Sequence, residues 1–463
     1  MGAPDSLPRF NAFVECSAHD SASTPQPAAP ARWYVLILLA TIYALNIADR
    51  FVISTLIEPI KAELHLSDSA VGFLTGVALA LTFVTVGVPL AVLADRVNRR
   101  NLIALSLGVW SLMTAVCGLT RTFWQLALAR IFVGVGAAGS TPPSQSLVSD
   151  YFPWRRRAIA LSVYSVGASI GSMLGSSAGY MSEHWGWRSA FLVLGIPGLA
   201  LAVMFRATVQ EPGRGRLDSH SLADGAPNFA AVLKFMLGQP ALLHVLAGAT
   251  LFTLWAWGLL WWTPSYLVRS HHLSLREAGG ALSLMHGVGG TAVLLATSLL
   301  MSELAGRDPR AVPRFLVFAC ALGVFPSFFA FAAESRGTAL AMLWIFIPMS
   351  YALFGPAFAL IQNLVPASMR SQAVAVLFFL ANVANLVIVP LAVGMVSDLL
   401  APRYGPESLR IALLPLTLFG PWAAVHFWMC GRRLDVGLAR AGTAAAQSGM
   451  ANLEILRTRP VEL

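Results

Sequence analysis

The sequence predicts an all-α polytopic membrane protein with twelve transmembrane helices in two pseudo-symmetric six-helix bundles. Three observations lead to this prediction. Of the 463 residues, 57% are hydrophobic and only 11% are charged, less than half of the ~25% charge typical of soluble domains. Apolar stretches of about 20 residues recur from Trp33 onward, and each is long enough to cross a hydrocarbon core ~30 Å thick. Short motifs of the first half also recur in the second.

This composition excludes a soluble globular protein, a disordered chain and a nucleic-acid-binding protein, although the net charge is +9. The spacing of the four cysteines indicates neither a disulfide framework nor a zinc site. The sequence contains no phosphate-binding loop, nucleophile elbow or pair of catalytic carboxylates. We therefore expect no enzyme activity, no metal and no cofactor.

The apolar stretches define the expected spans and the organisation of the chain. The longest polar gap, 207–229, follows the sixth span and predicts a linker between two halves. The twelve spans are expected at 33–57, 70–94, 101–119, 122–148, 158–181, 188–206, 241–267, 278–301, 313–332, 337–363, 371–397 and 409–431. The expected divisions are a flexible tail 1–31, an N-terminal bundle 32–206, a linker 207–232, a C-terminal bundle 233–431 and a tail 432–463.

The distribution of basic residues predicts the orientation. Even-numbered loops and the two tails hold 21 of the 31 lysines and arginines, and odd-numbered loops hold 8. Because cytoplasmic loops of membrane proteins are enriched in Lys and Arg, we expect both termini and the linker to be cytoplasmic.

The two halves repeat short motifs in the same order. Leu93-Ala94-Asp95-Arg96 after the second span recurs as Leu304-Ala305-Gly306-Arg307 after the eighth. Phe152-Pro153 after the fourth span recurs as Val365-Pro366 after the tenth. Such duplication around a central linker is typical of two-bundle secondary transporters.

Three charged residues lie inside the expected spans. Asp49 and Arg50 are neighbours in the first span, and Arg130 lies in the fourth. A charge at the bilayer centre costs about 2.5–3.5 kcal/mol on insertion scales, so such residues normally face a bundle interior and have partners. Adjacent helical residues point about 100° apart, so Asp49 and Arg50 cannot neutralise each other directly. We expect Arg130 to be a partner of this pair.

Two interpretations of these charges stay open. In the first, Asp49 is a proton-coupling switch, because burial favours the neutral acid and a nearby arginine favours the carboxylate. Arg50 and Arg130 then bind an anionic headgroup, together with Asn46. In the second, the charges form a structural ion pair that fixes helix register.

A charged stretch with Asp95, Arg96, Arg99 and Arg100 follows the second span. Positive-inside placement is one explanation of its basic residues. The other is a conformational gate, in which Asp95 accepts hydrogen bonds from a neighbouring helix end or arginine in one state and releases them in the other. We assign all four residues to this expected gate.

The later spans add further candidates. Gly167, Gly171, Gly175 and Gly179 form a stripe in the fifth span, which we interpret as tight helix packing rather than substrate contact. Trp255, in the aromatic seventh span, is deep enough to line a cavity. His286, among glycines of the eighth span, is a candidate proton or substrate contact. The alternative for His286 is a packed, hydrogen-bonded residue.

These motifs resemble those of the major facilitator superfamily. Asp95-Arg96-x-x-Arg99-Arg100 is similar to that superfamily's motif between its second and third helices, with Ala91 in place of the leading glycine. Arg130 with Gly134 and Gly136 is similar to its fourth-helix pattern. The likeness covers residues 33–431 and implies the major facilitator fold.

Within the superfamily the chain most resembles the Spinster branch, through Asn46–Phe51, Ala129–Gly136 and Ser149–Pro153. The resemblance implies a proton-linked or facilitative carrier of lysolipids and sphingoid phosphates. It also implies that Asp49 takes up protons in a central cavity where Arg50 meets the headgroup. One position departs from the branch, since Ala137 stands where its fourth helix usually has a glutamate. Proton-coupled and facilitative transport therefore both stay open.

We expect a secondary transporter that moves an amphiphilic, anionic, lipid-like solute by alternating access, with proton coupling through Asp49. The alternative within transport is a carrier of a small organic anion or drug. A receptor or scaffold that transports nothing is disfavoured, because it needs no charges at the bilayer midplane. The expected partners are the solute, protons and the lipid bilayer, with no nucleic acid. We expect a monomer in a bacterial inner membrane.

Overall fold

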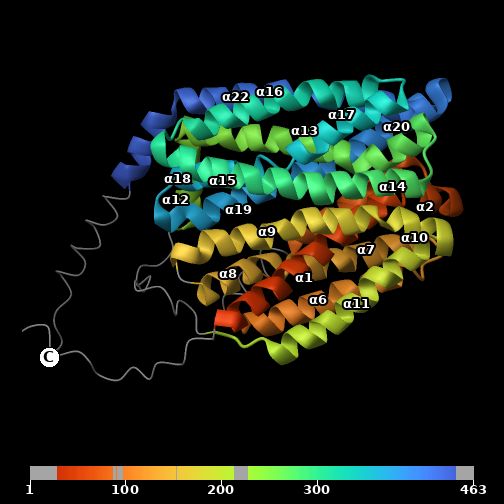
Figure 1. Cartoon of the computed structure of the whole chain (residues 1–463), viewed down its shortest axis with the longest axis horizontal. Helices are drawn as coiled ribbons and strands as arrows, with labels where there is room; N and C mark the ends of the chain where they lie inside the picture. The colour runs from red at the N-terminus through yellow and green to blue at the C-terminus, as the bar shows by residue number, and fades with distance from the viewer. Residues whose placement is uncertain (1–28, 87–89, 91–96, 153, 213–227, 445–463) are drawn as a thin grey trace, which may run out of the picture.

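The computed structural model describes residues 29–86, 90, 97–152, 154–212 and 228–444. These residues form helices and no strand, and most helices run side by side along the long axis of the molecule (Figure 1). The N-terminal half, red to yellow, lies against the C-terminal half, green to blue (Figure 1). The side of the molecule where residues 29 and 444 lie is called the terminal end here, and the opposite side the far end.

The helices of the N-terminal half match its six expected spans. Several spans consist of two or three consecutive helical segments. In chain order these are α1 (Ala29–Thr55), α2 (Ile57–Leu64), α3 (Asp68–Gly72), the π-helical η1 (Phe73–Val77), α4 (Ala78–Thr85), α6 (Arg99–Cys117), α7 (Phe123–Ala138), α8 (Thr141–Tyr151), α9 (Trp154–Ser176), α10 (Ala178–Trp185) and α11 (Trp187–Thr208).

The C-terminal half matches the other six spans, and a short helix at its start overlaps the expected linker. Its elements are α12 (Phe229–Leu237), α13 (Pro240–His271), α14 (Leu275–Leu284), η2 (Met285–Gly290), α15 (Thr291–Arg307), α16 (Ala311–Ala332), α17 (Arg336–Met349), α18 (Phe354–Asn363), η3 (Ala367–Met369), α19 (Arg370–Asn382), η4 (Val383–Ile388), α20 (Val389–Tyr404), η5 (Gly405–Glu407), α21 (Ser408–Leu413), η6 (Leu414–Leu418) and α22 (Phe419–Arg432). A further helical stretch covers 434–444.

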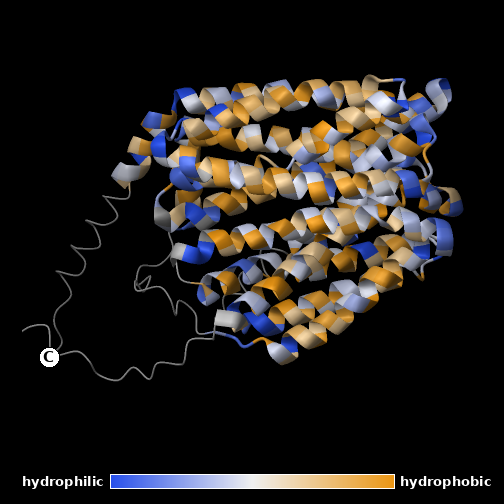
Figure 2. Cartoon of the chain, in the orientation of Figure 1, coloured by the Kyte–Doolittle hydropathy of each residue, from blue (hydrophilic) through white to orange (hydrophobic). Residues whose placement is uncertain are grey.

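The length and composition of these helices suit a membrane. Within the described ranges, nine helical segments are long and apolar enough to cross one, and the longest, Gln372–Arg432, runs through two of the expected spans. Apolar residues cover the middle of the helices, while hydrophilic residues gather at both ends (Figure 2). The predicted all-α polytopic class is therefore confirmed.

Each half has its own hydrophobic core. One cluster of buried side chains runs from Val35 to Val209, entirely inside the N-terminal half. The other runs mainly from Val232 to Leu434, and also includes Ile47, Phe51, Ile57, Val71 and Ala80 of the N-terminal half, where the halves meet. Most of each core therefore lies within one bundle, which suits two bundles that move against each other as units.

The glycine stripe of α9 packs against α1, as its spacing predicts. A Cβ atom on Gly171 would collide with the carbonyl oxygen of Ala44, and one on Gly175 would collide with that of Ala48. Small residues let two helix backbones approach closely in a membrane. This close contact joins α1, which carries Asp49 and Arg50, to α9 of the same bundle.

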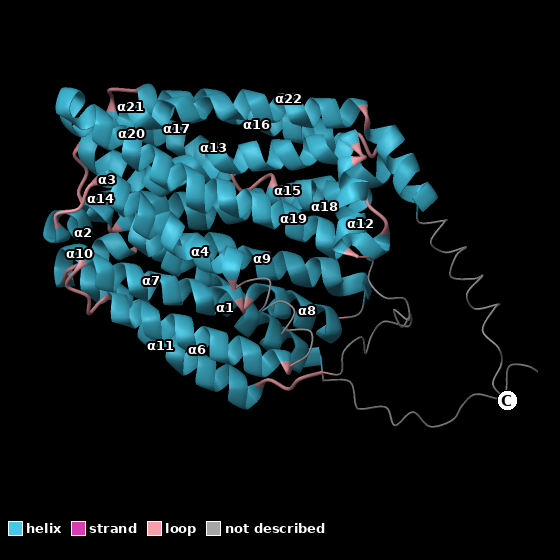
Figure 3. Ribbon diagram, turned by 180° about the vertical axis from the view of Figure 1, so that it is seen from behind, coloured by secondary structure: helices cyan, strands magenta, loops and turns pink. Residues whose placement is uncertain are grey.

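Two similar crossings join the halves at the far end. Gly394 of α20 lies against the backbone of Asp68 in α3, and Gly179 of α10 lies against that of Leu275 in α14. In both places a Cβ atom would collide with a carbonyl oxygen of the other half. Figure 3 shows α3 and α20 beside each other at this end, away from the termini. The halves therefore meet closely at the far end.

Candidate functional site

A buried ion pair joins the first and fourth spans. Arg130 of α7 donates from Nη1 to Asp49 Oδ2 at 2.7 Å, and Thr114 of α6 donates to Asp49 Oδ1 at 2.6 Å. Arg130 is completely buried, and Asp49 is 3% exposed. The expectation that Arg130 is a partner of the pair in α1 is therefore confirmed, with Asp49 as the residue it binds.

Side-chain polar atoms that make no hydrogen bond among the described residues lie beside this ion pair. Nε and Nη2 of Arg130 and both side-chain polar atoms of Asn46 are buried and have no hydrogen-bond partner among the described residues. Asn46 precedes Asp49 by three residues, which places the two on the same side of α1. A buried polar atom without a hydrogen bond costs about 1–3 kcal/mol. The cluster around Asp49 therefore has hydrogen-bonding groups beyond those that its ion pair uses.

A cavity of about 430 Å³ lies between the two halves. Tyr43, Ile47 and Arg50 of α1 line it at the spacing of one helical face. Asp49 and Arg130 are not part of its lining. Among the described residues around the cavity, Arg50 is the one that carries a charge. Adjacent residues of α1 thus face different surroundings, since Asp49 points into the N-terminal bundle and Arg50 borders the cavity.

The C-terminal half supplies a mixed aromatic and polar wall. Ala249, Thr253, Trp257 and Trp261 line the cavity along one face of α13. Trp261 donates from Nε1 to Asn385 Oδ1 at 2.6 Å, which fixes its indole ring. Further apolar lining comes from Phe252, Leu294, Phe358, Leu377 and Phe378.

The cavity extends toward the terminal end and is closed toward the far end. Its lining includes Gln145, in the middle of α8, and Gln362, near the end of α18, and both helices lie toward the terminal end (Figure 1). In the other direction Ser54 of α1 donates to the backbone carbonyl of Trp261. This hydrogen bond joins the halves just beyond the cavity.

A network of ion pairs and hydrogen bonds connects the halves at the far end. We call it the far-end latch, and it consists of Glu58, Lys61, Asp68, Arg269, Ser397 and Asp398. Arg269 binds both carboxylate oxygens of Asp68 at 2.7 Å and donates to Glu58 at 2.9 Å. Ser397 also donates to Asp68 at 2.7 Å. Asp398 accepts hydrogen bonds from the backbone N–H groups of Asp68 and Ser69, at 2.8 Å each. An acid at a helix N-terminus is favoured by the helix dipole. These contacts connect the two halves of the chain through five residue pairs.

The latch is expected to stay closed in mild acid. Burial alone would raise the pKa of Asp68, but hydrogen bonds and charge from Arg269, with help from Lys61 and Ser397, hold it well below its usual range. A carboxyl whose pKa is lowered stabilises the closed form above its ordinary pKa of about 4, and loses this only as the pH falls toward the lowered value. Distances between nitroxides at Leu119 and Arg403, exposed on the two halves at the far end, should therefore be the same at pH 8 and pH 5. Opening with a midpoint between these values would contradict this role of Asp68.

The predicted gate after the second span is only partly within the described residues, since Asp95 and Arg96 lie outside them. Arg99 donates to Asp150 at 2.5 Å and to Glu211 at 2.7 Å. The backbone N–H of Arg100 also donates to Glu211, at 2.8 Å. All these partners belong to the N-terminal half, so Arg99 and Arg100 tie α6 to α8 and to the segment after α11. Their role in gating stays a prediction.

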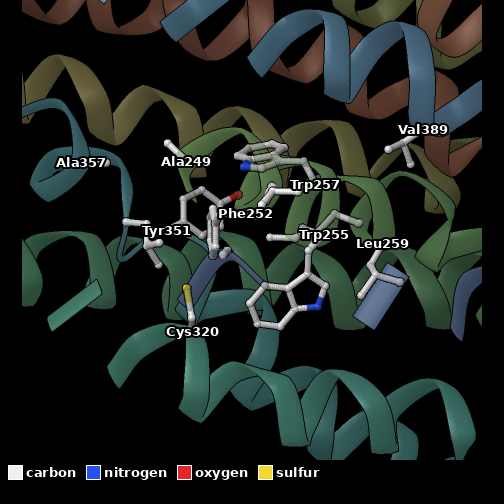
Figure 4. Close-up of a cluster of buried hydrophobic side chains, with 14 of the residues drawn as sticks. Ala249, Phe252, Trp255, Trp257, Leu259, Cys320, Tyr351, Ala357 and Val389 are labelled. Carbon is white, nitrogen blue, oxygen red and sulfur yellow. The ribbon is translucent and has the colours of Figure 1, made fainter. Parts of the chain in front are cut away.

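Trp255 lies behind the cavity. Its ring is buried against Gly323 and Gly420, and Nε1 donates to Ser327 at 3.1 Å. Figure 4 shows Trp255 on the other side of α13 from Trp257. Trp255 is not among the lining residues, so the structure places it in the core of the C-terminal half.

His286 lies one layer behind the cavity, where the halves meet. It is 2% exposed, and its Nδ1 is 2.9 Å from the hydroxyl of Tyr351, which lines the cavity. Its ring also contacts Phe51 of α1 edge to face, with 5.0 Å between ring centres. His286 therefore contacts two residues of the cavity lining, Tyr351 and Phe51, without lining the cavity itself.

Two groups of residues were missed by reasoning from the sequence. The first group is the aromatic lining with Tyr43, Trp257 and Trp261. The sequence does indicate the two tryptophans, because they continue a spacing of four residues along one face of α13. The far-end latch has a weaker signal, since its charged residues lie between the expected spans or at their ends, where charged residues are common. In the described part of the chain, no group of His, Cys, Asp or Glu has the make-up of a metal site.

Comparisons with known proteins agree with this architecture. The family model described as Major Facilitator Superfamily matches residues 39–389. An MFS-type efflux pump of Mycolicibacterium smegmatis is 32% identical, over 87% of this chain and 93% of that protein. Protein spinster homolog 1 of Rattus norvegicus is 27% identical, over 81% of this chain and 75% of that protein.

The fold of this chain is also similar to that of a solved structure. It is the crystal structure of a bacterial homolog to the human lysosomal transporter Spinster, in an inward-facing and unoccupied conformation. It aligns with a TM-score of 0.77 at 26% identity, covering 89% of this chain and 99% of that one. The chain therefore belongs to the Major Facilitator Superfamily of membrane transporters, as a Spinster-like member with the twelve-helix fold.

Proposed function

We propose that this transporter moves an anionic, amphiphilic, lipid-like solute by alternating access. The observation that carries the proposal is the cavity between the halves, in whose described lining Arg50 is the charged residue on one wall and aromatic and aliphatic side chains lie on the other. An arginine binds a phosphate or carboxylate through several directed hydrogen bonds. The apolar lining suits a hydrocarbon chain, so one cavity can bind both parts of an amphiphile.

The proposed motion is a rocking of the bundle at 32–206 against the bundle at 233–431. The closed far end and the cavity that extends to the terminal end support a state open on the terminal side. The basic residues of the even-numbered loops support a cytoplasmic location of this end. On that basis we propose an inward-open state in a bacterial inner membrane, with the linker 207–232 and both tails in the cytoplasm. We propose that a monomer is sufficient, because the cavity lies inside one chain.

The proposed coupling ion is a proton carried by Asp49. Arg130 and Thr114 bind the carboxylate in this state, and a buried carboxylate without a cationic partner favours its protonated form. Arg50 is the next residue of the same helix. A headgroup that pulls on Arg50 therefore moves the backbone that carries Asp49, and binding and protonation become linked. We propose that Asn46 offers hydrogen bonds beside Asp49, and that His286 positions Tyr351 of the cavity wall through their hydrogen bond.

A second candidate function is export of a small organic anion or drug. The observation that favours it is the relative at 32% identity, which is described as an efflux pump. Arg50 suits any anion, so the two candidates differ in whether the solute needs a hydrocarbon chain.

Replacing Arg50 by glutamine tests the proposed role of its charge. Purified protein in liposomes would be assayed for uptake of lysophosphatidylglycerol, which is anionic, and lysophosphatidylcholine, which has no net charge. Hydrogen bonds to charged groups contribute about 1.5–3 kcal/mol. Uptake of the anionic lipid by Arg50→Gln should therefore fall at least tenfold, while uptake of the neutral one changes less than twofold.

Arg50→Lys is the matched control, because it keeps the charge but loses the planar donor group. It should retain the preference for the anionic lipid in a weakened form. An equal loss of both uptakes in Arg50→Gln, with unchanged folding, would show that Arg50 does not select the solute by its net charge.

A further inference from the structure

A second cavity lies at the terminal end of the C-terminal bundle, and Phe427 is the residue that its described lining shares with the cavity between the halves. The second cavity has a volume of about 460 Å³ and is formed where α16 begins and α22 ends. Arg310, Arg314 and Arg432 stand around it. Pro313 and Trp428 belong to its apolar lining. These residues are outside the transport site described above.

The charge of this cavity is positive and only loosely neutralised. Arg310 pairs with Asp435, and Arg314 pairs with Asp308 at 2.9 Å. The side chains of both pairs are between 45% and 68% exposed, and ion pairs so exposed to solvent typically contribute 1 kcal/mol or less. The guanidinium of Arg432 lies 4.8 Å from the ring centre of Trp428. Three arginines thus face two carboxylates, and a stronger anion can displace these weak pairs.

Two apolar stripes lead along the helices to the cavity. On α16, Phe325, Leu322 and Phe318 are exposed at intervals of three and four residues, and Arg314 follows one turn further. On α22, Trp422, Val425 and Trp428 are exposed in the same way, and Arg432 follows. Figure 2 shows the hydrophobic colour along these helices and hydrophilic residues at their ends. In a membrane such stripes face acyl chains, and each one ends in an arginine at the terminal end.

We infer that this cavity, here called the arginine pocket, binds the headgroup of an anionic phospholipid of the surrounding bilayer. The phosphate lies between Arg314 and Arg432, and the acyl chains follow the exposed stripes of α16 and α22. Basic pockets between membrane helices are known to suit acidic lipid headgroups. The bound lipid joins the ninth and twelfth spans on the outer surface of the C-terminal bundle. This site is independent of the transported solute.

Native mass spectrometry of the full chain in detergent tests this inference, with added phosphatidylglycerol, phosphatidylcholine or free glycerol 3-phosphate. Phosphatidylglycerol should bind with a defined stoichiometry and more tightly than phosphatidylcholine. Each arginine near a charged membrane surface contributes about fivefold in affinity. The double variant Arg314→Gln/Arg432→Gln should therefore bind this lipid roughly 25-fold more weakly.

A charge-matched control separates the pocket from general attraction. Arg206 and Arg440 are exposed toward the same end but lie outside the pocket, so Arg206→Gln/Arg440→Gln should bind phosphatidylglycerol like the parent protein. Equal weakening in both double variants would overturn the inference, as would equal binding of the two phospholipids. Glycerol 3-phosphate binding as tightly as the lipid would overturn the role of the acyl chains. All four exchanged arginines are on the surface, so folding can be confirmed by an unchanged Tm.

Discussion

Asp49→Asn is expected to abolish accumulation of the solute against its gradient. For one coupled proton, a difference of one pH unit supplies about 1.4 kcal/mol, which corresponds to tenfold accumulation. Asparagine has nearly the shape of aspartate and can still accept the hydrogen bond of Thr114 through its single side-chain oxygen, but its amide nitrogen cannot accept the one from Arg130, and it does not titrate. Uptake into liposomes with an imposed pH gradient should therefore equal uptake without one. The ratio of the two uptakes should fall from about 10 in the parent protein to about 1 in the variant.

The main confounding effect is instability, because Asp49→Asn leaves Arg130 buried without its carboxylate. Breaking a buried ion pair at one partner costs about 3–5 kcal/mol. The double variant Asp49→Asn/Arg130→Gln removes both charges and should recover the folded yield while remaining unable to use the gradient. If the double variant still accumulates solute tenfold in response to pH, Asp49 is not the coupling group.

Arg269→Gln is expected to shift the conformational equilibrium toward a state open at the far end. Arg269 supplies three of the hydrogen bonds that join the halves there, two to Asp68 and one to Glu58. Loss of the Arg269 guanidinium should destabilise the closed state more than the open state, because water can hydrate Asp68 in the open state. Even 1.4 kcal/mol would raise the open population tenfold. Nitroxides at Leu119 and Arg403 should report a new, longer distance in pulsed electron paramagnetic resonance.

Arg336→Gln provides the matched control for this measurement. Arg336 is also at the far end and pairs with Glu277 at 2.9 Å, but both residues belong to the C-terminal half and are exposed. Its loss should leave the distance distribution unchanged. A distribution in Arg269→Gln that equals that of the parent protein would mean that the close helix crossings at Gly394 and Gly179, rather than the latch, hold the far end closed.

The sequence is informative about features that one helix carries by itself. Span lengths follow from apolar runs, and the need of Asp49 for a partner follows from the cost of charge in a bilayer. Arg130 was the natural choice, because few charges lie deep in spans. The orientation of a helix face follows from its period. Trp257 and Trp261 are four residues apart and share a face, whereas Trp255 points almost to the opposite side of α13.

The remaining features depend on which end of the molecule is closed. Asp68 and Arg269 are 201 residues apart in the chain, and Asp398 is 330 residues from the backbone N–H of Asp68 that it binds. Their contact exists because the halves meet at the far end. A transporter that alternates between states breaks such contacts in each cycle, so no local pattern marks them. The arginine pocket likewise needs the ends of α16 and α22 to lie together, which their positions in the sequence do not predict.

The central claim is that the cavity selects an anionic headgroup together with a hydrocarbon chain. The most direct test is saturable uptake of lysophosphatidylglycerol by the unmodified protein in liposomes, compared with protein-free liposomes, in competition with other solutes. Sphingosine 1-phosphate should compete strongly, whereas glucarate, an anion without a chain, and uncharged drugs should not. Uptake of glucarate or a drug, with no transport of either lipid and no competition by them, would contradict the account.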